Sequence, residues 1–205
     1  MKNKQKEKVY KAIVVGASAG GVEALTTVLP ALNADLNFSV VVVQHISPHS
    51  DSFLVDYLNQ LSPIKVKEVE EKEHIIPGVV YFAPPNYHLL IEEDETFSLT
   101  VDDKVNYSRP SIDVLFETAA VAFNQSLIGV ILTGANSDGA EGMKRIKQFG
   151  GLTVVQDPSS AYVDVMPLAA LEAIHADHIL KLEEIAPFLN ALSDLMKPYS
   201  EKNRK

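Results

Sequence analysis

The sequence predicts a three-layer α/β/α fold, in which a doubly wound, mostly parallel sheet lies between helices and carries an antiparallel strand insert. Two observations predict it. Three apolar runs that are rich in β-branched residues and too short for helices end near residues 15, 45 and 132. Segments with helical spacing of apolar residues follow these runs. Strands that are apolar on both faces are typical of parallel sheets covered by helices on both sides.

The first half of the chain alternates strands and helices from residue 9 onward. A strand over 9–15 is followed by a helix from residue 21, which we expect to stop just before Pro30 because proline has no N–H to donate. A second strand covers 38–45. Ser50 or Asp51 is expected to cap a helix that reaches about Leu61, and 64–69 is expected to be a strand.

The middle of the chain predicts the antiparallel insert. Short strand patterns occur over 79–83, 87–91 and 97–101, with no helical segment between them. Such close spacing indicates antiparallel pairing on one side of the sheet, since parallel neighbours require a longer crossover.

The second half returns to alternation. We expect Ser111 to cap a helix over 112–124, and Gly150-Gly151 to stop another over 140–149. The further predicted elements are strands over 127–132, 152–156 and 178–182, and helices over 167–174 and 183–196. The whole pattern is Rossmann-like. We expect one domain over residues 9–196, with a disordered lead over 1–8 and a polar tail over 197–205.

The composition excludes several classes of protein. The 205 residues carry a net charge of −9 and include no cysteine. The charge argues against nonspecific nucleic-acid binding, and the lack of cysteine excludes disulfides, thiolate nucleophiles and iron–sulfur clusters. No apolar run approaches the ~20 residues of a membrane span, so we expect a cytoplasmic protein without membrane insertion. The sequence gives no indication of a cofactor or of its oligomeric state.

The turn after the first strand carries a candidate nucleophile. Gly16-Ala17-Ser18-Ala19-Gly20 fits the G-x-S-x-G elbow, where a serine lies on a sharp strand-to-helix turn. The N–H groups at the start of the following helix favour developing negative charge at this point. The same turn is also compatible with binding a phosphate or nucleotide, or with a purely structural role.

Three polar residues follow the three apolar strands: Ser18, His45 and Asp138. Because the carboxyl ends of parallel strands line one crevice, these residues are expected to meet there as nucleophile, base and orienting acid. Taken singly, each has a more ordinary explanation, such as a strand-end histidine or, for Asp138, the N-cap of the next helix. Their occurrence together at three strand ends favours a catalytic triad.

Two other arrangements are weaker. A triad in the order serine, acid, histidine would use His175 or His178, which we expect at a helix end and at the start of a strand, away from the crevice. A metal site built on His45, His49 and Asp51 lacks the helix that paired ligands would need, because Pro48 interrupts it. His88 is best explained by packing or by a surface position.

The sequence resembles the catalytic domain of CheB-type protein-glutamate methylesterases. The resemblance covers nearly all of residues 10 to 190. It rests on Gly16-Ala17-Ser18-Ala19-Gly20-Gly21, Gln44-His45, Ala83-Pro84 with His88-Leu89, Arg109-Pro110-Ser111-Ile112-Asp113-Val114-Leu115-Phe116, Val130-Ile131-Leu132-Thr133-Gly134 with Asp138-Gly139-Ala140-Glu141-Gly142-Met143, and Met166-Pro167 with Ala170. It implies a serine hydrolase that removes methyl esters from glutamates on the cytoplasmic helices of chemoreceptors, often also deamidates receptor glutamines, and has its triad at Ser18, His45 and Asp138.

The sequence departs from the family pattern in three places that bear on function, one of which is the segment over 46–51 beside His45, where the family more often has a methionine- and proline-rich form. Family members usually carry an N-terminal receiver domain, whereas this sequence starts almost directly at the first strand, as a stand-alone enzyme or one piece of a longer protein. The family's usual Thr-Gly-Met-Gly reads Thr133-Gly134-Ala135-Asn136. By this resemblance, the candidate oxyanion donors are the backbone N–H of Ala135, at the family's methionine position, and that of Ala19, next to the serine. The alternatives to a methylesterase are a phosphate- or nucleotide-binding module and a relative that docks on receptors without catalysis.

Overall fold

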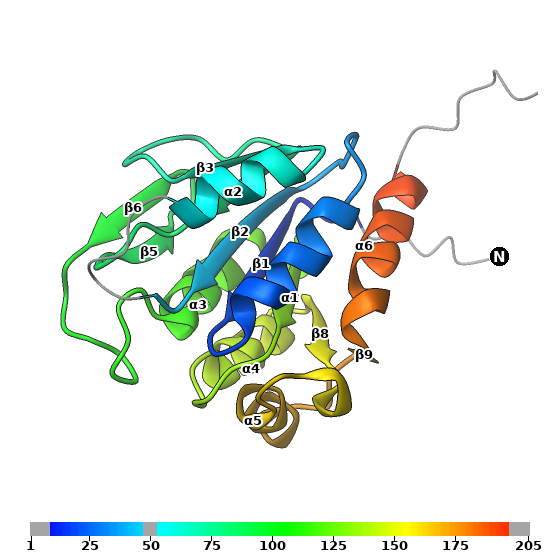
Figure 1. Cartoon of the computed structure of the whole chain (residues 1–205). Coiled ribbons are helices and arrows are strands. Elements are labelled where there is room, and N and C mark those ends of the chain that lie inside the picture. The colour runs from blue at the N-terminus through cyan, green and yellow to red at the C-terminus, as the bar shows by residue number, and fades with distance from the viewer. Residues whose placement is uncertain (1–8, 47–52, 197–205) are drawn as a thin grey trace, which may run out of the picture.

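The computed structural model describes residues 9–46 and 53–196, which form a three-layer α/β/α arrangement around one large sheet (Figure 1). The seven strands of this sheet are all parallel, in the order β3-β4-β2-β1-β7-β8-β9. They are β1 (Ala12–Ala17), β2 (Ser39–Gln44), β3 (Lys65–Glu68), β4 (Val79–Phe82), β7 (Leu127–Ile131), β8 (Leu152–Gln156) and β9 (His178–Leu180). The predicted fold class is confirmed.

Helices cover both faces of the sheet and create two hydrophobic cores. One face is covered by α1 (Gly21–Val28), α2 (Phe53–Leu61) and α6 (Leu182–Met196), and the other by α3 (Ile112–Phe123), α4 (Ala140–Gln148) and α5 (Val165–Ala173). Short 3-10 helices cover Leu29–Ala31, Asn124–Ser126 and Pro158–Ser160. Along β1, Ile13 and Val15 belong to the first core, whereas Ala12 and Val14 belong to the second. The alternation of side chains along a strand explains why β1 must be apolar on both faces.

The antiparallel insert is smaller than expected. Among the strands of the described residues, β5 (His88–Ile91) and β6 (Phe97–Thr100) are the antiparallel pair, and they form a separate two-stranded sheet. The expectation that the 79–83 strand is antiparallel is wrong, because β4 pairs parallel with both β2 and β3. All four β4 residues are buried. A strand that is apolar on both faces is stable inside the large sheet between helices, whatever the length of its connections.

Most predicted element boundaries agree with the structure. α1 ends at Val28, and Pro30 lies in the 3-10 turn that follows, as expected. Gly150, with a φ of 80°, comes just after the end of α4. α5 begins at Val165, so Pro167 lies within its first turn. The proposed cap at Ser50 or Asp51 lies outside the described residues, as do the lead over 1–8 and the tail over 197–205, so those domain limits stay a prediction.

The longest helix, α6, has 15 residues, and across 9–46 and 53–196 none of the helices has the length and apolar character to cross a bilayer.

The order of the strands locates the ligand crevice. β1 lies between β2 and β7, so the chain leaves β1 toward one edge of the sheet and later returns on its other side. Ligands of open α/β sheets bind at such a reversal, beyond the carboxyl ends of the strands.

Candidate active site

The register between β1 and β2 brings Ser18 and His45 together. Ala17 pairs with Gln44, and the backbone N–H of His45 donates to the Ala17 carbonyl at 3.0 Å. The next residue on each strand therefore lies at the same edge of the sheet. His45 Nδ1 lies 3.2 Å from Ser18 Oγ, within hydrogen-bond distance for transfer of the serine proton.

Asp138 completes the predicted constellation from the loop after β7. Its Oδ2 lies 2.9 Å from His45 Nε2, and the side chain is fully buried. An Nε2–H that donates to the carboxylate leaves the lone pair of Nδ1 free to accept the Ser18 proton, so one tautomer satisfies both contacts. The ring nitrogens exchange roles relative to the chymotrypsin arrangement, but the order hydroxyl, imidazole, carboxylate is the same. The three strand-end residues thus meet as predicted.

Two buried polar side chains hold the serine turn in place. The Gln44 amide donates to the carbonyl oxygens of Ser18 and His45, at 2.9 and 3.0 Å, and so ties the backbones of both residues together. The Thr133 hydroxyl lies 2.8 Å from the Ala19 carbonyl oxygen and accepts the Val163 N–H. Neither role was predicted. The available signal was a glutamine ending an apolar strand, because a buried amide must find hydrogen-bond partners.

The backbone near Ser18 offers the expected donors for an oxyanion. The loop after β7 lies against the serine, since a Cβ added to Gly134 would be 3.0 Å from Ser18 Cβ. Among the described residues, the N–H groups of Ala19 and Ala135 donate no hydrogen bond, whereas those of Ser18 and Gly134 donate to Thr133 and Val163. Ala19 and Ala135 therefore have free donors on this rim, and the N–H of Gly20 also donates no hydrogen bond among the described residues.

Asp138 also caps a helix, but not the one that follows it. Its carboxylate accepts the N–H groups of Ile112 and Asp113 at 2.8 and 3.1 Å, at the start of α3. Ser111 is the N-cap residue of α3, as predicted, but its side chain makes no capping hydrogen bond, because its hydroxyl instead donates to Asp138 Oδ1 at 2.9 Å. Asp138 thus takes the place of the serine side chain as the acceptor for the free N–H groups of the first turn.

A carboxylate at the start of each of the helices α3 and α4 accepts backbone N–H groups at the start of the other helix. Asp113, in the first turn of α3, accepts the N–H of Gly142, in the first turn of α4, at 2.7 Å. A Cβ at Gly142 would lie 2.5 Å from Phe116 Cβ, so only glycine lets α4 approach α3 this closely. Asn106 Nδ2 lies 2.8 Å from Asp113 Oδ2 and 3.2 Å from Asp138 Oδ1, and so bridges the two acids.

The two buried acids differ in pKa. Burial alone would raise the pKa of Asp138, but hydrogen bonds from His45 and from the backbone of Ile112 and Asp113 outweigh it and hold the pKa below its usual value. For Asp113, burial is the largest influence and raises the pKa to about 6, with the nearby charge of Asp138 acting in the same direction. Asp138 is thus kept charged for the imidazole, while Asp113 gains a proton in mildly acidic solution.

Asp113→Asn is expected to remove a pH dependence of stability. A folded-state pKa of about 6 against the usual 3.8 means that the native state holds this proton more tightly than the unfolded chain. Wild-type stability therefore falls as pH rises from about 4 to about 6, by up to about 3 kcal/mol at about 1.4 kcal/mol per pH unit. Asparagine keeps an oxygen for the Gly142 N–H. Its stability relative to wild type should rise over this range in urea unfolding.

The matched control is Glu141→Gln, which changes an exposed carboxylate in the cleft that Asp113 also lines. This variant keeps the Asp113 carboxyl, so the fall in stability between about pH 4 and about pH 6 should remain. If the stability curves of wild type and Asp113→Asn run parallel over this pH range, the pKa of Asp113 is the same in the folded and unfolded states, and the prediction is wrong.

The alternative site residues lie elsewhere. His178 packs against Phe188 of α6 with the two rings tilted and their centroids 4.4 Å apart, and His175 is exposed just beyond α5. His88 is buried, where its Nε2 lies 3.0 Å from the Asp103 carbonyl and its Nδ1 accepts the Ser111 N–H, so the packing interpretation holds. His49 and Asp51 lie outside the described residues, and the described part of the chain contains no cluster of potential metal ligands.

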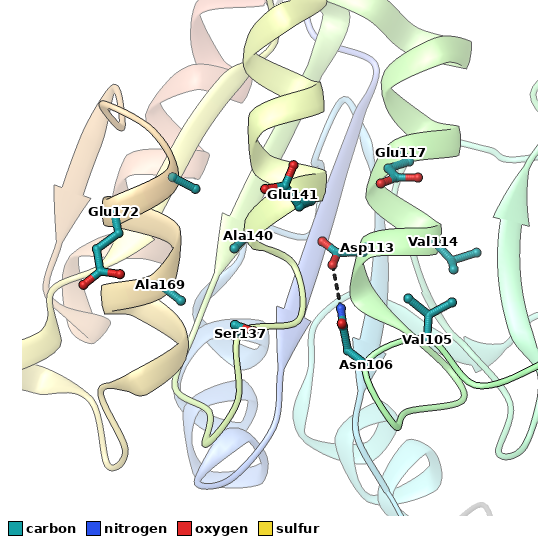
Figure 2. Close-up of a pocket in the computed structure, with 11 residues that line it drawn as sticks. Val105, Asn106, Asp113, Val114, Glu117, Ser137, Ala140, Glu141, Ala169 and Glu172 are labelled. Atoms are coloured by element: carbon teal, nitrogen blue, oxygen red, sulfur yellow. Dashed lines mark hydrogen bonds between the residues drawn. The ribbon is translucent and has the colours of Figure 1, made fainter.

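Two hollows flank the triad. A cavity of about 110 Å³ is lined by His45 together with Lys104, Tyr107 and Arg109. A larger cleft of about 640 Å³ lies between α3, α4 and α5, where Figure 2 shows Asp113, Glu117 and Glu141 around it. His45 lines the smaller cavity but not the larger cleft, and Ser18 lines neither, so the smaller cavity is the hollow next to the candidate base.

Comparison with known proteins identifies the family. The family model described as CheB methylesterase matches residues 13–189. This chain belongs to the CheB methylesterase family. Ser18, His45 and Asp138 all lie inside the matched range.

A solved structure and curated sequences agree with this assignment. The crystal structure of the Thermotoga maritima CheB methylesterase catalytic domain matches with a TM-score of 0.86 at 34% identity, over 89% of this chain and 98% of that one. A Leptospira interrogans protein, provisionally named protein-glutamate methylesterase/protein-glutamine glutaminase, is 57% identical over 86% of this chain and 92% of its own length. A Geobacter metallireducens protein with that name is 37% identical over 89% of this chain. The matched region is 53% of the Geobacter protein's length.

Proposed function

We propose that this CheB-family chain is a protein-glutamate methylesterase, a carboxylic ester hydrolase that acts on methylated glutamates in the cytoplasmic helices of chemoreceptors. The observation that carries the proposal is the continuous contact from Ser18 Oγ through the His45 ring to Asp138, at 3.2 and 2.9 Å. The relatives' names support a glutamate methyl ester of a protein as the substrate, and the chemoreceptor follows from the resemblance to CheB. Chemotaxis signalling, a cytoplasmic location and a domain over 9–196 are parts of the same proposal.

The proposed reaction is acyl transfer in two steps. Ser18 Oγ attacks the ester carbonyl carbon while His45 Nδ1 takes its proton, and the resulting oxyanion is held by the N–H groups of Ala19 and Ala135. His45 then gives the proton to the departing methoxide, and methanol leaves. Water, deprotonated by His45, attacks the acyl carbon; the bond to Ser18 Oγ then breaks, His45 returns the proton to Oγ, and the glutamate carboxylate is released. A glutamine amide passes through the same steps with ammonia as the leaving group.

Asp138 keeps the imidazole in the required tautomer and stabilises the imidazolium that forms after proton transfer. The carboxylate suits this role because the start of α3 and the Ser111 hydroxyl already hold it in one orientation. No step in this scheme calls for a metal or cofactor.

A fluorophosphonate probe and a methylated chemoreceptor domain test the proposal together. We expect covalent labelling at Ser18, located by mass spectrometry of peptides, and release of methanol from the receptor domain. The competing prediction of a phosphate- or nucleotide-binding module is saturable nucleotide binding without labelling. That result, with no methanol released, would contradict the proposed function.

A further inference from the structure

A two-residue turn between Val105 and Ser108 presents an exposed tyrosine beside the triad. Each of the two end residues donates its N–H to the other's carbonyl, at 3.2 and 2.8 Å. The central residues, Asn106 and Tyr107, have φ values of 49° and 63°. Two consecutive positive φ values are typical of type I′ hairpin turns, in which asparagine followed by glycine is favoured. A tyrosine therefore stands where glycine is the usual residue.

Folding gives no reason for this tyrosine. Its backbone lies in the left-handed region, which is unfavourable for a residue with a Cβ. Its side chain is 97% exposed, so it buries almost no apolar surface in return. Unfavourable backbone conformations that the fold does not need occur mainly at functional sites.

The surroundings of the turn hold its backbone firmly. The Arg109 guanidinium donates to Asn86 Oδ1 and to the carbonyl oxygens of Val101 and Asp102. This arginine therefore anchors the segment that leads into the turn, and its donors already have partners within the protein. Tyr107 is thus presented on a fixed support rather than on a loose loop.

The turn borders both hollows at the site. Tyr107 and Ser108 line the cavity that contains His45, whereas Val105 and Asn106 line the larger cleft. Figure 2 shows Asn106 pointing from the turn toward Asp113, with the hydrogen bond between them drawn as a dashed line. The same amide nitrogen contacts the triad acid Asp138 at 3.2 Å. One side of the turn therefore faces the entrance to the triad and the other contacts its carboxylate.

The size of the smaller cavity, which His45 lines, indicates which part of a protein substrate stays at its rim. Its volume of about 110 Å³ equals that of a few water molecules, so it admits one amino-acid side chain and no more. A protein that inserts an esterified side chain here must leave its backbone and neighbouring residues at the rim. Exposed tyrosines are among the residues that most often contribute binding energy at such contacts.

We propose that the Val105–Ser108 turn reads the protein substrate: Tyr107 contacts the segment that flanks the esterified glutamate, and Asn106 links the turn to the triad carboxylate as a positioning residue. This inference rests on the proposed methylesterase function and specifies how that site selects a protein over a small ester.

The test compares two substrates, a methylated chemoreceptor domain and p-nitrophenyl acetate, in the full chain. Glycine accommodates the φ of 63° at position 107, so Tyr107→Gly should fold with an unchanged or raised Tm. Its kcat/KM should fall about tenfold more on the receptor domain than on the small ester, mainly through KM. A structural role for the side chain predicts equal effects on both substrates.

Asn106→Gly tests the second half of the proposal. Glycine fits the φ of 49° but removes the amide that bridges Asp113 and Asp138. We expect kcat to fall several-fold on both substrates and the pH profile of kcat to change, because the two carboxylates then face each other without a shared donor. Lys72→Gly is the matched control, since Lys72 also has a positive φ, 62°, but is exposed near Ser98, outside the cavity.

The outcomes separate the two proposals. Equal losses on both substrates for Tyr107→Gly, or an unchanged kcat on the small ester for Asn106→Gly, would overturn the role of the turn while the methylesterase function stands. Lys72→Gly should match wild type on both substrates. A wild-type chain that releases no methanol from the receptor domain and is not labelled at Ser18 would instead contradict the function itself.

Discussion

Ser18→Ala should reduce methyl-ester hydrolysis by about 10⁴- to 10⁶-fold, the loss expected when a serine hydrolase loses a member of its triad. Among the described residues, Ser18 Oγ is the hydroxyl that lies within hydrogen-bond distance of His45 Nδ1. The fold should persist, because the Ser18 backbone is held by Thr133 and Gln44, and its hydroxyl contacts only His45 among the described residues. Methanol release from a methylated receptor domain gives the rate.

Ser137→Ala is the matched control for this variant. Ser137 is exposed on the loop after β7 and lines the larger cleft, outside the cavity that contains His45. It should keep wild-type activity. Near-wild-type hydrolysis by Ser18→Ala, with a native circular dichroism spectrum, would remove Ser18 from the reaction.

Asp138→Ala should impair both activity and stability. The carboxylate accepts hydrogen bonds from His45 Nε2, the Ser111 hydroxyl, the Asn106 amide and two backbone N–H groups at the start of α3. Alanine leaves the buried donors of α3 and Ser111 without an acceptor, each at a loss of about 1–3 kcal/mol. We therefore expect destabilisation by about 3 kcal/mol or more in urea unfolding, and a fall in kcat of about 10⁴-fold.

The contrast with two other variants separates the roles of Asp138. His45→Ala should lose the activity but little of the stability, because His45 is partly exposed and caps no helix. Asp138→Asn keeps one acceptor oxygen, so it should be less destabilised than Asp138→Ala yet still poorly active, since the amide cannot select the required tautomer. If Asp138→Ala unfolds at the same urea concentration as wild type, then its hydrogen bonds to α3 add no net stability.

Several features of the site were predictable because they depend on residues close in the chain. The apolar run over 38–45 identified β2, and a polar residue directly after such a run must lie at the carboxyl end of the sheet. The same reasoning located Ser18 after β1. The position of Asp138 was harder to predict, since this residue lies in a loop beyond β7 and its distance from His45 depends on the order of the strands.

The errors arose where the decisive partner is distant in sequence. Ser111 has the residue type of a helix cap, yet the carboxylate of Asp138 accepts the N–H groups of α3 instead, because a charged acceptor forms the stronger hydrogen bond. The antiparallel pairing expected for β4 was inferred from connection length. In the structure β4 pairs parallel with β2 and β3 and is buried on both faces inside the large sheet.

The sequence by itself determined the parallel sheet, the serine turn and the chemical identity of the three strand-end residues, because apolar periodicity and turn composition are local properties of the chain. Only the tertiary structure decided which helix Asp138 caps, how Gln44 ties Ser18 to His45, and that Asn106 bridges two buried acids. Those contacts follow from the close approach of α3 and α4 and from the register of β1 on β2, which bring together groups that no local pattern relates.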